Sequence, residues 1–190
     1  MISVKTERFY SAHHVLQRIA KDHLLKAQSK EPGWFDSLFI SISLSSLAIE
    51  AICNAVGEKA LDKWCDFESC SPIAKIRLIC ERLGIDYDGG IEPWGTIIWL
   101  SKTRNLISHP KAHHIKYEAI ITLEEQQNQS YRNMPKSKLE LQITPTNAKK
   151  SVEAVDKLVE LFCTKLTLDQ KFGIVGDMWH SSAKVHTDEN

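Results

Sequence analysis

Arg104, Asn105 and His109 form the most chemically informative group of the chain, in the stretch RNLISHP that begins at residue 104. The Arg104 guanidinium keeps its charge in proteins, and its planar fork of donors suits phosphate oxygens. The His109 imidazole can take up and release a proton near neutral pH. A phosphate-binding cation beside a proton-transfer group, with no carboxylate cage for a metal ion, points to metal-independent cleavage of an RNA backbone.

The proline after His109 decides where the imidazole lies. In an uninterrupted helix, the five residues from Arg104 to His109 turn through about 500°, so the two side chains would point about 140° apart. Pro110 cannot continue a helix, and it moves the preceding residue out of the helical region. We therefore predict His109 at the C-cap, free to turn back toward Arg104. A plainer interpretation stays open, in which Arg104 is a solvated helix cation and His109 an ordinary cap.

The composition is that of an ordinary globular chain. Its 190 residues are 43% hydrophobic and 25% charged, which suits one domain with a short appendage. The 24 basic and 24 acidic residues give a formal net charge of zero, so any contact with RNA must come from a local patch. The five cysteines are odd in number and form no CxxC pair, which indicates free thiols and a cytoplasmic location.

No metal ion or cofactor is expected. The chain has no Walker loop, GxGxxG or GxSxG motif, so nucleotide hydrolysis, dinucleotide binding and serine-hydrolase chemistry lack support. His109, His113 and His114 are close in sequence, but Pro110 disrupts helical spacing and no carboxylate or cysteine joins them. His13 and His14 indicate a solvated helix face rather than a pair of metal ligands.

Five segments have apolar residues at helical spacing: about 5–29, 35–57, 72–84, 93–109 and 147–166. The segment 35–57 is apolar on two faces. Its second apolar face, called the outer face below, consists of Ile40, Leu44, Leu47 and Ala51. We therefore expect this helix at the centre of a bundle or in an oligomer interface. Four serines within 41–46 and the charge of Glu50 argue against a membrane span.

Alternating apolar residues predict a small β-hairpin over about 115–144, with a polar connection at 124–137. The predicted fold is therefore all-α: a bundle of four to five main helices with this hairpin inserted before the last one. Residues 1–170 would form the domain. Residues 171–190 would form a frayed C-terminal tail, because they offer few packing residues.

The order of these segments resembles the HEPN superfamily (higher eukaryotes and prokaryotes nucleotide-binding domain). The resemblance covers about residues 5–168 and rests on SLAIEAICNAV, SPIAKIRLICERLG, a Pro-Trp helix start and TRNLISHPK. The family motif is an arginine, usually followed by a polar residue, and a histidine four to six residues after the arginine. Here these are Arg104, Asn105 and His109.

The resemblance implies a homodimer that brings two copies of the motif face to face. Many members are metal-independent endoribonucleases of toxin, antiviral or RNA-processing systems, so the implied partners are RNA, a second copy and an antitoxin or other protein. His109 would act as general acid or base, Arg104 would hold the phosphate, and Asn105 would position the reacting groups. Other members are inactive, so the alternative is a non-catalytic dimer that binds RNA, a nucleotide or a partner protein.

Four further residues complete the predicted site. Some subfamilies have a glutamate just before the arginine; this chain has none there, so Glu50 could orient Arg104, or it could simply pair for stability. Ser108 is assigned a supporting role. Lys111 and Trp94 are assigned to substrate binding, Trp94 as part of a base pocket with the neighbouring Trp99, although tryptophans at these spacings are also typical core residues.

Overall fold

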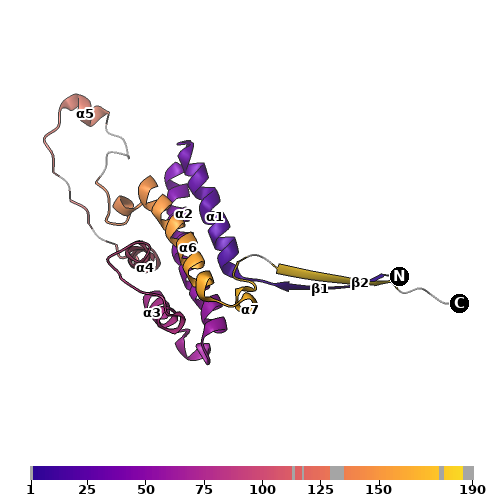
Figure 1. The fold of residues 1–190 in the computed structure, drawn as a ribbon. Helices are drawn as coiled ribbons and strands as arrows, with labels where there is room; N and C mark the ends of the chain where they lie inside the picture. Colours follow the sequence, from indigo (N-terminus) through magenta and orange to yellow (C-terminus); the bar gives the residue numbers. More distant parts are fainter. Residues whose placement is uncertain (1, 113, 117, 129–134, 176–177, 186–190) are drawn as a thin grey trace.

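The chain folds as a helical bundle in the computed structural model, which describes all residues except 1, 113, 117, 129–134, 176–177 and 186–190 (Figure 1). The helices are α1 (Ala12–Gln28), α2 (Trp34–Ala60), α3 (Pro72–Leu83), α4 (Trp94–Ser108), α5 (Leu123–Gln127), α6 (Pro145–Lys165) and α7 (Leu168–Lys171). Two 3-10 helices, η1 (Trp64–Phe67) and η3 (Glu140–Gln142), and two strands, β1 (Ile2–Phe9) and β2 (Met178–Val185), complete the described elements. The predicted all-α class is confirmed for the bundle.

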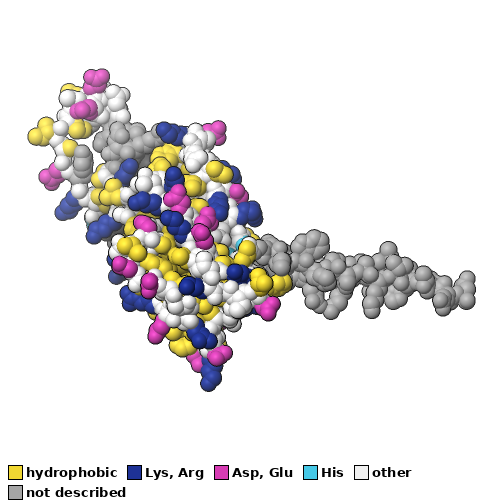
Figure 2. Space-filling model, in the orientation of Figure 1, with side chains coloured by type: hydrophobic (Ala, Val, Ile, Leu, Met, Phe, Trp, Pro, Cys, Tyr) yellow, Lys and Arg dark blue, Asp and Glu magenta, His cyan; other side chains and the backbone are white. Residues whose placement is uncertain are grey.

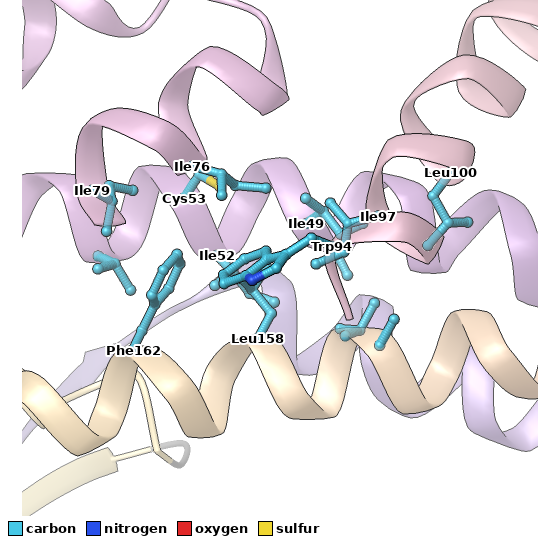
Figure 3. Packing of buried hydrophobic residues seen from close by; sticks show 14 of the residues in the cluster. Ile49, Ile52, Cys53, Ile76, Ile79, Trp94, Ile97, Leu100, Leu158 and Phe162 are labelled. Atoms are coloured by element: carbon cyan, nitrogen blue, oxygen red, sulfur yellow. The ribbon is translucent and has the colours of Figure 1, made fainter. Parts of the chain in front are cut away.

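α2 is the central helix, because α1, α3, α4 and α6 all pack against it. Ile42, Ile49, Ile52 and Val56 are at most 2% exposed and form its buried face. Figure 3 shows how side chains from α2, α3, α4 and α6 meet in this core. By length and composition alone α2 could also cross a membrane, and half of its most apolar window is buried inside the bundle.

Short-range sequence signals determine where α3 and α4, the two helices that carry the predicted site together with α2, begin and end. The Ser71 hydroxyl accepts from the Ala74 N–H at the start of α3, and Gly84 ends this helix with a φ of 63°. α4 begins after Pro93 and ends at Ser108, with His109 as the C-cap, whose N–H donates to the Asn105 carbonyl at 3.0 Å. These caps are short-range interactions, so both helix ends fall close to their predicted positions.

The predicted β-hairpin over 115–144 is wrong. The described part of this range holds α5 and η3 and no strand. Local hydrogen bonds compete with strand pairing here, since Thr122 and Glu125 form a reciprocal capping box and the Ser137 N–H donates to Glu140. The described residues of 110–138, called the arm below, lie away from the bundle between α4 and η3 (Figure 1). An alternating pattern alone does not make a strand when no partner strand lies alongside.

The first and last segments also differ from the prediction. Residues 2–9, partly assigned to the first helix, form β1, which pairs antiparallel with β2 from Ile2 opposite Val185 to Phe9 opposite Met178. The C-terminal segment therefore contains a strand. Ile174 is 1% exposed, so the packed domain continues past residue 170.

Two further corrections concern α1 and α6. His13 is fully buried and its Nε2 donates to the Ile174 carbonyl at 3.1 Å, so it does not belong to a solvated face. His14 likewise donates to the Gly173 carbonyl at 3.2 Å. α6 begins two residues before the predicted cap Asn147, with Thr144 as the N-cap and Pro145 in the first turn.

Candidate functional site

Glu50 of α2 and Arg104 of α4 form an ion pair at the centre of the predicted site. Glu50 Oε2 lies 2.9 Å from Arg104 Nη2, and the side chains are 27% and 32% exposed. The two residues are distant in sequence and meet because α4 packs against α2. The contact fits the predicted orienting role of Glu50, and a guanidinium held at one edge presents its remaining donors in a defined direction.

Lys75 of α3 holds the same carboxylate from the other side. Its side chain is 1% exposed, and its Nζ lies 3.4 Å from Glu50 Oε1 and 2.9 Å from Asn54 Oδ1. Glu50 thus bridges two cations. We call Glu50, Asn54, Lys75 and Arg104 the Glu50 network.

Sequence reasoning missed Lys75 and Asn54, although a signal was present. Lys75 lies one turn before Ile79 and next to Ile76, on the buried stripe of α3. A lysine at an apolar position is rarely buried without a charge partner. That pattern predicts a buried carboxylate, but it does not say which one.

The Glu50 network carries an excess of positive charge, which it presents to solvent through Arg104. One carboxylate faces two cations, so the group carries a formal charge of +1 with Glu50 ionised. Arg104 Nε is also buried and has no hydrogen-bond partner among the residues that the structure describes. Because buried donors are usually paired, the guanidinium is only partly satisfied in the isolated chain.

His109 lies where the sequence predicts it, at the C-cap of α4 with φ −128° and ψ 56°. Its side chain is exposed, as are those of Asn105 and Ser108. Within the described residues, no hydrogen bond joins the His109 ring to Arg104. Arg104 faces α2 and the imidazole lies at the solvent-facing end of the helix, so their convergence on one substrate stays a prediction.

The two predicted substrate-binding residues have different outcomes. Trp94 is 2% exposed and packs in the core, with its ring 5.1 Å from that of Tyr87. Its assignment to a base pocket is therefore wrong, because the first turn of α4 faces the bundle interior. Its neighbour Trp99 donates from Nε1 to Gln142 Oε1 at 2.6 Å. Lys111 is exposed just after Pro110, and its role in substrate binding stays a prediction.

The described residues contain no group of three or more His, Cys, Asp or Glu side chains that could hold a metal ion. His113, one of the histidines considered for a metal site, lies outside the described residues. Acidic and basic side chains are interspersed over the face shown in Figure 2. An anion would therefore be attracted by a local group such as the Glu50 network rather than by the whole surface.

Comparison of the chain with protein-family models, with curated proteins and with solved structures gives no match. The resemblance to the HEPN superfamily therefore rests on the motif and on the order of the helices.

Proposed function

We propose that the chain is a metal-independent endoribonuclease that acts at the C-terminal end of α4. The Glu50 network is the observation that carries the proposal: it fixes one edge of the Arg104 guanidinium at 2.9 Å and leaves the group with a formal positive charge. The exposed imidazole of His109 follows on the same helix end. As the family resemblance implies, such an enzyme would serve a toxin, antiviral or RNA-processing system.

In the proposed reaction, His109 removes the proton from the ribose 2′-hydroxyl. The 2′ oxygen then attacks the phosphorus, and the bond from phosphorus to the 5′ oxygen breaks. Arg104 stabilises the negative charge that develops on the phosphate oxygens. The leaving 5′ oxygen takes a proton from water or from the protonated imidazole of a second copy. The products are a 2′,3′-cyclic phosphate, which water can open to a 3′-phosphate, and a 5′-hydroxyl.

A homodimer is part of this proposal. On the outer face of α2, Ile40, Leu44 and Ala51 are only partly buried and Leu47 is 40% exposed. This apolar face adjoins Glu50 on the same helix, so a two-fold contact there would bring two copies of the motif close together. Light scattering should give the mass of a dimer at micromolar concentration, and a monomer would contradict this part.

The decisive experiment incubates the purified protein with RNA in EDTA. General acid–base catalysis typically contributes about 10²–10⁴-fold, so His109→Ala should lose activity by that factor while the exposed neighbour His114→Ala stays near wild type. Arg104→Lys keeps the charge but loses the fork of donors, so it should remain clearly impaired. DNA of the same sequence should survive, because it has no 2′-hydroxyl. A requirement for Mg²⁺, or equal cleavage of DNA, would refute the mechanism.

One observation favours a second candidate, a non-catalytic dimer that binds RNA, a nucleotide or a partner protein. Arg104 is already paired with Glu50, and no described contact brings His109 to it. Binding of RNA without cleavage under any condition, weakened by Arg104→Ala but not by His109→Ala, would establish this alternative. A bell-shaped pH profile of cleavage would instead support the enzyme.

A further inference from the structure

A pocket of about 680 Å³ opens where α1 ends and where α2 and α6 begin. Its apolar lining includes Leu24, Ala27, Trp34 and Leu38, with Pro145 on the side of α6, and it lies away from the Glu50 network. Pockets of about 300–1,000 Å³ are typical binding sites, so this one has room for several aliphatic side chains.

The charged groups that line this pocket are basic. Lys30, in the turn after α1, and Lys149, in the second turn of α6, both line it. The Lys149 side chain is 68% exposed and approaches Glu153 only to 3.8 Å, so its charge remains open to another partner. The pocket therefore suits an apolar occupant that carries negative charge.

The arm has this chemistry. Ile120 is fully exposed, Leu123 is 77% exposed and Ile121 is 44% exposed. Three exposed glutamates flank these residues in EAIITLEE: Glu118 precedes them, and Glu124 and Glu125 follow them. Figure 2 shows hydrophobic and acidic side chains together on the arm at the upper left. A run of apolar side chains in water on a projecting segment marks a contact surface.

We propose that residues 118–125 of one copy dock into this pocket of a second copy. The apolar side chains would fill the lining, and Glu118 and Glu124 would pair with Lys30 and Lys149, while Glu125 keeps its contacts with Thr122. The arm leads away from its own bundle in Figure 1, which is why the second copy is the occupant. Exchange of arms between two copies makes the same contact twice, and we place it on the same two-fold axis as the contact through the outer face of α2, so that both contacts belong to one dimer. This inference does not rest on RNA cleavage.

The first test is a cross-link between two different copies. Gln28→Cys, which lines the pocket, and Ile120→Cys are made in separate full-length chains, both in a Cys65→Ser/Cys70→Ser background. After mixing and mild oxidation, a disulfide that joins the two introduced thiols should form between chains. Leu168→Cys, 86% exposed and outside both the arm and the pocket, replaces Ile120→Cys in the control and should not cross-link.

The second test exchanges charges. Lys30→Glu with Lys149→Glu should weaken self-association about tenfold or more, and Glu118→Lys with Glu124→Lys in the same chain should restore it. The matched control, Lys102→Glu with Lys165→Glu, changes two exposed lysines elsewhere and should have little effect. Ile120→Asp with Leu123→Asp should also weaken association at least tenfold without loss of helix, because both side chains are exposed in the single chain.

Three outcomes would overturn the proposal. One is a cross-link that forms only within a single chain when Gln28→Cys and Ile120→Cys are combined. Another is self-association unchanged by the Ile120→Asp/Leu123→Asp variant. The third is charge reversal that weakens association but is not restored by the exchange in the arm. An inactive protein that still passes both tests would separate this inference from the proposed function.

Discussion

At the scale of single residues, Glu50 is the carboxylate that pairs with both Lys75 and Arg104. Glu50→Gln would leave Lys75, 1% exposed, with only Asn54 as an uncharged partner. Breaking a buried pair in this way typically costs about 3–5 kcal/mol. Lys75→Met should cost less, because Glu50 keeps Arg104 and no uncompensated charge is buried.

The double variant Glu50→Gln/Lys75→Met should be more stable than Glu50→Gln alone, because it removes both charges. Urea unfolding of the four proteins measures this as a double-mutant cycle. If Glu50→Gln unfolds at the wild-type urea concentration, the network contributes nothing to stability.

The five cysteines should differ in reactivity. Burial raises the pKa of the Cys53 thiol, and it raises the pKa of Cys80 to about 11. At about pH 8 both therefore stay protonated, and only the thiolate is alkylated quickly. Cys65 is exposed and should react first. Iodoacetamide labelling followed by mass spectrometry checks the order, with full labelling in urea as the control; rapid labelling of Cys53 in the folded protein would contradict it.

At the scale of elements, Gly57 in α2 and Gly84 after α3 each exclude a larger residue, for different reasons. A Cβ at Gly57 in α2 would lie 2.4 Å from the ring of Trp64, which is 4% exposed, so Gly57→Ala should destabilise by about 1–3 kcal/mol through overpacking. Gly84 has open space around it but a φ of 63°, so Gly84→Ala should cost about 1–2 kcal/mol through backbone strain.

Gly95 provides the control for both variants, because its nearest contact would be an ordinary 3.6 Å. Gly95→Ala should not destabilise. Thermal or urea unfolding of the three variants gives the comparison. A Gly57→Ala protein as stable as the wild type would mean that Trp64 does not pack against α2 as described.

At the scale of the whole molecule, the core that the structure describes extends to Ile174, between α7 and β2. The described core runs from Ala27 to Ile174, and the Ile174 carbonyl accepts from buried His13. Truncation after Val175 should therefore leave the helical circular dichroism and the unfolding temperature close to wild type. Truncation after Leu166 removes the buried side chain of Ile174. The lost packing should lower the free energy of unfolding by about 2–5 kcal/mol and the unfolding temperature by roughly 5–15 °C. Equal losses from both truncations would contradict this boundary.

The parts of the fold that depend on local interactions could be predicted from the sequence. The helices from 35 and 72 follow from apolar periodicity, and Ser71 and Gly84 mark the ends of α3 through contacts within a few residues. Pro110 likewise places His109 at the C-cap, because a proline acts on the residue directly before it.

Only the tertiary structure decided what depends on contacts between distant segments. A strand exists only beside a partner: the described residues of 115–144 hold no strand, while residues 2–9 pair with 178–185 from the far end of the chain. Trp94 is buried because the first turn of α4 packs against the bundle interior. The Glu50 network exists because α3 and α4 pack on the same helix, which no spacing in the sequence specifies. Periodicity tells which face of a helix is buried, but the partner of a buried charge is chosen by packing.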